Sequence, residues 1–188
     1  MSTSLSKNLP ETLMSVRTKP LFVLTEQIPP LIVVGHTPDA FRRIGVVQGG
    51  SFEGDRLSGE VVTGNDWQAV RKDDCTRLDV RLVLRTTDGA SIVMTYQAFR
   101  HGPPSVMEKL DKGEAVDPTS YYFRMIPLFE TSAPKYDWMN RIVAVGIGHR
   151  RADGLFTASS RFFDVPPGTS FRSDSHFLRE GHRKRTDQ

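Results

Sequence analysis

Two neighbouring segments of the chain alternate between apolar and polar residues. Within 77–86, leucine or valine stands at positions 78, 80, 82 and 84 between mostly charged residues, and 90–100 has apolar residues at 92, 94, 96 and 98. A period of two is typical of a strand with one buried face. Asp88-Gly89 stands between them and supplies the positive φ of a tight turn. The pattern predicts an antiparallel hairpin.

Other strand-like segments flank this hairpin. We expect strands over 21–34, interrupted by Pro29-Pro30, and over 41–48, 66–71, 121–131, 141–151 and 155–165. Glycines between positions 49 and 59 indicate a bend, and short helical turns fit after Pro104 and over 133–140. Roughly nine short strands with little helix predict an all-β barrel or sandwich.

The composition fits one soluble globular domain. Of the 188 residues, 38% are apolar and 25% are charged, which excludes a disordered chain. No apolar run approaches the ~20 residues that span a bilayer, and the first 20 residues lack the apolar core of a signal peptide. We therefore expect a cytoplasmic protein that does not contact a membrane.

Basic charge gathers near the C-terminal end. The net charge is +3, and residues 172–188 hold five Lys/Arg against three Asp/Glu. The rest of the chain is close to neutral, which argues against a surface that binds a nucleic-acid backbone. A scaffold whose tail binds acidic partners stays open as a minor alternative.

Cysteine and histidine offer little chemistry. Cys75 is the only cysteine, which excludes an intrachain disulfide and a cysteine-based zinc cluster. It stands in RKDDCTRLD, without the nearby base that a nucleophilic thiol needs. None of the five histidines has the spacing of a metal motif. We expect neither a metal nor a cofactor.

The strand predicted over 121–131 has two very different faces. By alternation, one face carries Tyr122, Arg124, Ile126, Leu128 and Glu130, and the other is almost purely apolar. The apolar face should pack in a core. The mixed face either lines a lumen, because ligand sites are mostly apolar with a few polar groups, or lies outside with a surface ion pair. Both interpretations stay open.

The same choice arises for Asp79 and Arg81 in the strand 77–86. A charged strand face is usually solvated, and side chains of this kind that face inward have to be paired. Tyr136, Trp138 and Asn140 follow one another at every second position in a turn, where the large Trp138 indole would plug one end of a barrel.

The segments GGSFEGDRLSGEV, NDWQ, LDVRLVLRTTDGASI, YYFRMIPLFET, YDWMNRIVAVGIG and RRADG occur in this order. This ordered set resembles a largely microbial family of uncharacterised proteins, a domain of unknown function whose members resemble an allene oxide cyclase-like, calycin-related barrel. The resemblance covers about residues 20–154. It implies a closed barrel of about eight strands with a cavity for one small ligand, often assembled as an oligomer.

We therefore predict a single antiparallel closed β-barrel of about eight to nine strands with one or two short helical turns. We assign 1–18 to a flexible leader, 19–165 to the barrel domain and 166–188 to a basic, mobile tail. The sequence after 154 departs from the family's usual ending. Either 155–165 supplies the closing strand, or the barrel closes differently.

For function, the leading hypothesis is a barrel that holds a small apolar or aromatic carbonyl compound and catalyses a cofactor-free isomerisation or cyclisation. Arg124 would polarise an oxygen, Glu130 or Asp79 would move a proton, and Tyr96 would donate a hydrogen bond. The candidate ligand-binding residues are Arg81, Trp67, Tyr122, Tyr136, Trp138 and Asn140.

The alternative hypothesis is a non-catalytic carrier or sensor of a small hydrophobic ligand. The residues leave open whether a reaction is catalysed and which ligand is bound. A homo-oligomer remains a candidate assembly.

Overall fold

The computed structural model describes residues 9–10, 15–151 and 157–165, without the side chains of 157–161 and 165. Contacts group Thr18–Pro166 into one compact unit. Most of the predicted leader and all of the predicted tail lie outside the described residues.

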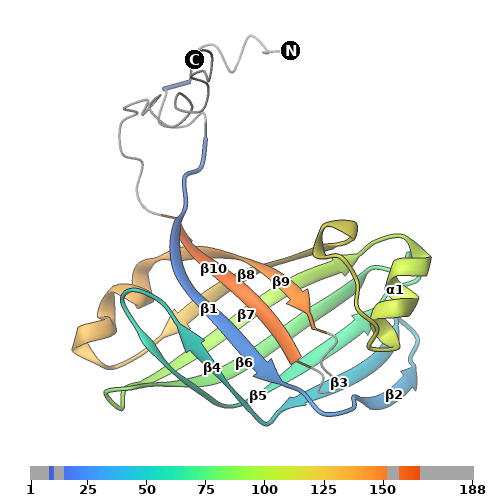
Figure 1. Cartoon of the computed structure of the whole chain (residues 1–188), viewed down its shortest axis with the longest axis horizontal. Coiled ribbons are helices and arrows are strands. Elements are labelled where there is room, and N and C mark those ends of the chain that lie inside the picture. The colour runs from blue at the N-terminus through green and yellow to red at the C-terminus, as the bar shows by residue number, and fades with distance from the viewer. Residues whose placement is uncertain (1–8, 11–14, 152–156, 166–188) are drawn as a thin grey trace, which may run out of the picture. The chain divides into compact units, whose positions relative to one another are not determined.

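The described residues form ten strands with short helices between them (Figure 1). The strands are β1 (Lys19–Gln27), β2 (Ile32–His36), β3 (Phe41–Val47), β4 (Gly49–Glu53), β5 (Ser58–Val70), β6 (Thr76–Thr86), β7 (Ser91–His101), β8 (Tyr122–Glu130), β9 (Val143–Arg150) and β10 (Thr157–Val165). The helices are α1 (Pro104–Asp111) and two 3-10 turns, η3 (Pro118–Ser120) and η4 (Pro134–Arg141). No helix in the described part of the chain is long and apolar enough to cross a membrane.

Eight of these strands close into an antiparallel barrel. Around the ring they follow the order β5, β4, β1, β10, β9, β8, β7 and β6, and the pairing of β6 with β5 completes the circle. β3 pairs with the second half of β5, and β2 pairs with β3. The predicted closed barrel is therefore confirmed. The short strand expected over 66–71 is the end of the longer β5.

The predicted hairpin joins β6 to β7. Gly89 has φ +88, a left-handed conformation that glycine adopts without steric penalty, and its N–H donates to the Thr86 carbonyl at 2.8 Å. The turn sets the register that places Leu82 opposite Met94. Both side chains point into the barrel and are fully buried.

The closing strand is supplied by the end of the barrel unit. β10 pairs with β1 on one side and with β9 on the other. The first of the two alternatives for 155–165 is therefore confirmed for residues 157–165. Positions 155 and 156 lie outside the described residues.

Aromatic rings fill the middle of the barrel. Phe22 and Phe162 approach to 5.0 Å between ring centroids, and Phe52 and Phe129 pack against Phe22. On the inner face of β9, Gly146 and Gly148 lie next to bulky core side chains. A Cβ on Gly146 would lie 2.5 Å from Met125 Cγ and 2.8 Å from the Phe162 ring. The β9 backbone therefore packs so closely on the core side chains that Gly146 has no space for a Cβ atom.

We expect Gly146→Ala to lower the free energy of unfolding by about 1–3 kcal/mol, because the new methyl group must displace packed side chains. The control is Val145→Ala on the adjacent, outward position, where 37% of the side chain is exposed. Urea denaturation of both variants tests this. Equal stability of the two would show that the core near β9 is loose.

Candidate functional site

Polar side chains continue the inward faces of several strands at one end of the barrel. Glu26 follows Leu24 along the inside of β1, and Arg100 follows Ala98 along the inside of β7. Asp66 and Gln68 point inward from β5. All four side chains are at most 5% exposed. Because β1, β5 and β7 are not neighbours in the ring, these groups meet across the lumen.

These side chains line a partly enclosed cavity of about 30 Å³, room for one or two water-sized molecules. Ile28 and Leu31, from the connection between β1 and β2, add apolar walls. The complete lining is Glu26, Ile28, Leu31, Asp66, Gln68, Leu78, Tyr96, Arg100, Phe123 and Arg150. We call this chamber the lumen cavity.

A hydrogen-bond chain links the lumen cavity to helix α1. The Gln68 side-chain amide donates to Asp66 and accepts from Arg43 Nε at 2.8 Å. Arg43 also forms an ion pair with Asp111 at 3.0 Å. Asp111 is the last residue of α1, and Leu110 beside it is fully buried in the core. The helix is thereby fixed to this end of the barrel, where Figure 1 shows it.

The pKa of Glu26 is shifted into the neutral range. Burial, followed by repulsion from Asp66, raises the pKa of Glu26 from 4.5 to about 8, although a hydrogen bond from Tyr96 acts in the opposite direction. Burial likewise raises the pKa of Asp66. A carboxyl group that titrates near neutral pH is suited to moving protons.

Burial also shifts the pKa values of the other ionisable groups at the cavity. Burial, and then the Glu26 and Asp66 charges, raise the pKa of Tyr96 well above its usual value. Burial and the neighbouring Arg43 lower the pKa of Arg100, and burial lowers that of Arg150 to about 10. The Tyr96 hydroxyl therefore keeps its proton and acts as a hydrogen-bond donor.

Several polar atoms at the lumen cavity have no hydrogen-bond partner within the described residues. They are Glu26 Oε1, Asp66 Oδ1, and Nε and Nη2 of Arg100. Buried polar groups are nearly always satisfied in native proteins. Four such atoms around one cavity mark it as the candidate functional site.

Tyr96 is the predicted site residue that the structure places at this cavity. Its side chain is 6% exposed, and its ring lies 6.4 Å from that of Phe162. The ring therefore packs on the aromatic core while the hydroxyl reaches Glu26. The predicted inward face of 90–100 is confirmed.

The lumen interpretation of the 121–131 face is wrong. Arg124, Glu130 and Tyr122 are exposed on the outside of β8, and so are Ile126 and Leu128 at 61% and 56%. The opposite face carries larger apolar side chains, and a barrel has one interior, so that face is buried. Arg124 donates to the Phe123 carbonyl at 3.0 Å and lies over the Tyr122 ring.

The predicted homo-oligomer stays a prediction.

Asp79, Arg81 and Trp67 also lie outside. Asp79 and Arg81 are on the exposed face of β6, which confirms the solvated alternative. Trp67 is 52% exposed and stands opposite Asp79 in register. These three side chains cannot reach the lumen cavity, because they point away from it.

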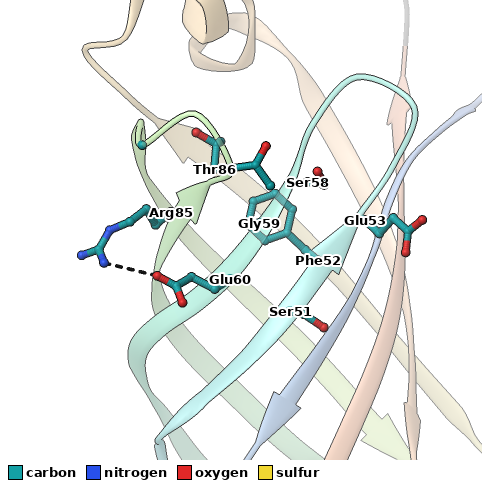
Figure 2. Close-up of a pocket in the computed structure, with 10 residues that line it drawn as sticks. Ser51, Phe52, Glu53, Ser58, Gly59, Glu60, Arg85 and Thr86 are labelled. Atoms are coloured by element: carbon teal, nitrogen blue, oxygen red, sulfur yellow. Dashed lines mark hydrogen bonds and ion pairs between the residues drawn. The ribbon is translucent and has the colours of Figure 1, made fainter.

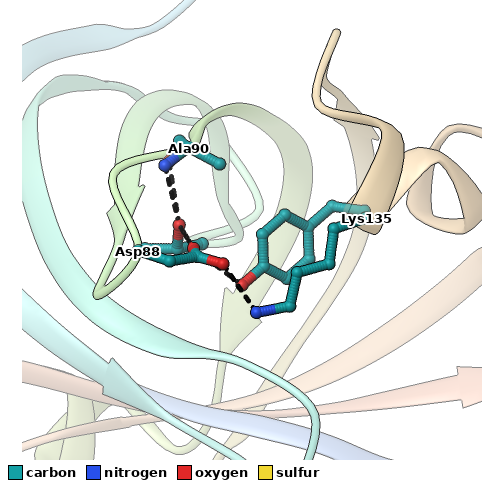
Figure 3. Close-up of polar contacts among 5 residues, drawn as sticks. Asp88, Ala90 and Lys135 are labelled. Carbon is teal, nitrogen blue, oxygen red and sulfur yellow. Dashed lines mark hydrogen bonds and ion pairs between the residues drawn. The ribbon is translucent and has the colours of Figure 1, made fainter.

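The turn η4 closes the other end of the barrel. The Tyr136 hydroxyl donates to Asp88 at 2.9 Å, and Lys135 pairs with the same carboxylate at 2.6 Å (Figure 3). These contacts hold the pKa of Asp88 well below its usual range. Tyr136 and Met139 are the buried side chains of this plug.

Trp138 and Asn140 stabilise the same turn. Trp138 is partly buried and packs on the core while Arg56 stacks over its ring at 3.7 Å. Asn140 is exposed and binds the backbone of Thr131 in both directions. The predicted plug is thus built chiefly by Tyr136 and Met139, and a ligand-binding role for these residues stays a prediction.

A larger groove of about 690 Å³ lies near the same end, between β4, β5 and the β6–β7 turn (Figure 2). It is open to solvent. Among its charged residues, Arg85 and Glu60 pair with each other at 3.2 Å and are more than half exposed, and Glu53 is exposed. Thr86, its buried polar residue, is bound to Asp88 and Ala90. The groove therefore lacks the unsatisfied polar groups of the lumen cavity.

Cys75 is partly exposed, and partial burial raises the pKa of its thiol, which disfavours the reactive thiolate. Within 9–10, 15–151 and 157–165, no three His, Cys, Asp or Glu side chains gather as metal ligands would.

The fold and its interior define a closed β-barrel protein with a buried, partly charged chamber. A family model described as "Protein of unknown function (DUF3237)" matches residues 16–164, and the chain belongs to this family. It is 35% identical over 140 residues to a UPF0311 protein of Rhodopseudomonas palustris, covering 74% of this chain and 92% of that protein. A UPF0311 protein of Clostridium acetobutylicum is 37% identical over 138 residues, with coverages of 72% and 87%.

Solved structures show the same barrel. A conserved protein of unknown function from R. palustris superposes with a TM-score of 0.74 at 33% identity, covering 81% of this chain and 98% of that chain. A β-barrel-like protein from Acinetobacter baumannii has a TM-score of 0.70 at 35% identity, with coverages of 85% and 99%. The predicted uncharacterised barrel family is confirmed, and the allene oxide cyclase-like resemblance stays a prediction.

The pKa of Glu26 predicts an unusual dependence of stability on pH. Between pH 4.5 and about 8 the folded state keeps a proton that the unfolded state loses, so stability falls as the pH rises through this window. Glu26→Gln mimics the protonated form. We expect its stability relative to the natural chain to rise by about 1–4 kcal/mol between about pH 5 and 9.

Urea denaturation at several pH values measures this difference. The matched control is Glu130→Gln on the exposed face of β8, which should leave the pH dependence unchanged. Parallel pH curves for Glu26→Gln and the natural chain would contradict a buried, protonated Glu26.

Proposed function

We propose that this barrel binds a small organic carbonyl compound in the lumen cavity and moves a proton on it without a cofactor, as in an isomerisation or cyclisation. The observation that carries the proposal is Glu26, a carboxyl group with a pKa of about 8. Glu26 lines the same cavity as the side chains of Tyr96 and Arg100.

The three side chains have complementary tasks. The ionised Glu26 removes a proton from the carbon beside the carbonyl group, and the electron pair moves onto the carbonyl oxygen. Arg100 donates a hydrogen bond to that oxygen as its negative charge develops, and the single Tyr96 hydroxyl proton turns from Glu26 to the same oxygen. Glu26 then returns the proton to another atom, which completes an isomerisation with no net gain or loss. Arg100 and Glu26 thus take the tasks that the sequence had assigned to Arg124 and Glu130.

The burial of these side chains supports this chemistry. Tyr96 and Arg100 are at most 6% exposed, and electrostatic stabilisation is stronger where water is excluded. A base with a pKa near the working pH combines sufficient ionisation with sufficient basicity. Because Glu26 must be ionised to act as a base, activity should rise with pH up to about 8.

A barrel from Penicillium herquei, described as an enzyme, superposes with a TM-score of 0.62 at 20% identity, covering 84% of this chain and all of that chain. The likeness concerns the fold alone. It supports the proposal to the extent that such a barrel is compatible with catalysis.

The second candidate function is a non-catalytic carrier or sensor with the same cavity. It is favoured by the apolar side chains of Ile28 and Leu31 in the cavity wall, which would hold an apolar ligand without taking part in a reaction.

Hydrogen exchange tests the proposal without knowledge of the natural substrate. The natural chain is incubated with acetone or butanone, small ketones suited to a cavity of about 30 Å³, in D2O, and deuterium uptake beside the carbonyl is followed by proton NMR. We expect uptake above the buffer rate, a loss of about 100-fold or more in Glu26→Gln, and a smaller loss in Tyr96→Phe.

Glu130→Gln is the matched control and should exchange at the natural rate, because Glu130 is outside the barrel. Equal uptake with the natural chain and with Glu26→Gln would contradict proton transfer by Glu26. If the ketones bind but do not exchange, the carrier function is supported instead.

A further inference from the structure

The lumen cavity has an excess of hydrogen-bond donors at one point. Arg100 is 3% exposed, and its Nε and Nη2 have no acceptor among the described residues. These two nitrogens share one edge of the guanidinium and direct their N–H bonds in parallel. A buried charged group without partners is strongly disfavoured, so this edge is suited to an acceptor that a ligand supplies.

The residues around Arg100 leave this edge open. Thr76 stands opposite Arg100 in the β6–β7 register, and Phe123 lies 5.7 Å from the guanidinium carbon. Asp66 attracts Arg100 electrostatically, but its Oδ2 accepts from Gln68, and its Oδ1 has no partner within the described residues. Asp66 therefore balances charge without occupying the donor pair.

The balance of charge at this end also favours an anion. Arg43 lies close enough to lower the pKa of Arg100, and Arg100 lowers the pKa of Arg150. Asp66 and Asp111 are two carboxylates facing these three guanidinium groups, and Glu26 adds no negative charge at neutral pH, because it is protonated below about pH 8. Arg43 is engaged by Gln68 and by Asp111.

We propose that the ligand of the lumen cavity is an organic acid whose carboxylate binds side-on to Nε and Nη2 of Arg100. Two parallel N–H groups match the two oxygens of a carboxylate, and such charge-assisted pairs are both strong and directional. The inference rests on the proposed function, since it names the class of compound for the same cavity. For an organic acid, both free N–H groups of Arg100 hold the carboxylate, so the carbonyl oxygen accepts its hydrogen bond from Tyr96, and the reacting carbon lies toward Glu26.

The size of the cavity limits how such an acid is held. A volume of about 30 Å³ accepts a carboxylate group, whereas a larger acid requires the side chains of Ile28 and Leu31 to move. Gly45 lies directly beneath them, since a Cβ there would be 2.9 Å from Ile28 Cγ2 and 3.2 Å from Leu31 Cδ2. The smallest acids are therefore the cleanest probes.

Acetate and acetamide form a matched pair of probes, because they have the same shape and differ in charge. Affinity is measured by NMR titration of the full chain at constant ionic strength. We expect acetate to bind the natural chain at least about tenfold more tightly than acetamide. In Arg100→Lys, which keeps the charge but loses the parallel donors, we expect this ratio to fall to about two or less.

Arg124→Lys is the control, because Arg124 is exposed on the outside of the barrel, and it should keep the full preference for acetate. Arg100→Gln serves as a second variant if Arg100→Lys does not fold, with the same expected loss. Equal binding of the two probes, binding of neither, or an acetate preference that survives in the folded Arg100 variant would overturn the inference.

The outcome is distinguishable from that of the proposed function. Ketone exchange that depends on Glu26, without any preference for acetate, leaves proton transfer standing and overturns the organic-acid inference. A preference for acetate that depends on Arg100, without ketone exchange, supports an organic-acid carrier.

Discussion

The closed barrel has one interior, and ionisable side chains from separate strands must share its drier end. Glu26 and Asp66 are both buried and repel each other, so ionising one disfavours ionising the other. Arg100 lies in the same space with two unsatisfied N–H groups. Most of the properties assigned to the lumen cavity follow from this shared confinement: the high pKa of Glu26, the retained proton of Tyr96 and the affinity for an anionic group.

The remainder of the barrel makes this confinement possible. Phe22 and Phe162 fill the middle of the lumen with aromatic rings, and burial of apolar surface is the main stabilising contribution in such a core. The η4 turn and the Asp88 contacts close one end. The other end is fixed by Arg43, which joins β3 to α1. The packed core and the two closed ends therefore hold Glu26, Asp66 and Arg100 together, although these groups leave some of one another's hydrogen-bonding atoms without a partner.

Alternation predicted the fold well because strand faces obey a simple rule. The inner face of β7 and the hairpin at Asp88-Gly89 could be read directly, and the same alternation places Arg100 after Ala98 on that face and Glu26 after Leu24 on β1. A charged residue that continues an apolar face was the available signal for both. The sequence instead favoured the β8 face that carries Arg124 as a possible pocket lining, because Ile126 and Leu128 on that face are apolar. Both of these side chains are in fact exposed.

Asp66 and Arg150 were beyond prediction for other reasons. An irregularity between Val61 and Thr63 interrupts the alternation of β5 before it reaches Asp66. On β9, Gly146 and Gly148 precede Arg150 on the inner face, and glycines do not reveal which face is buried. Closure of the ring, which brings β1, β5 and β7 together, is a property of the whole barrel rather than of any segment.

The central claim is that Glu26 is protonated in the folded barrel at neutral pH. Its side-chain carboxyl carbon is directly observable by NMR in a chain labelled with ¹³C at glutamate, and the signal is assigned by its loss in Glu26→Gln. The account predicts a titration midpoint near pH 8. A midpoint near the ordinary value of 4.5 would contradict it, because Glu26 would then be ionised in the folded barrel at neutral pH.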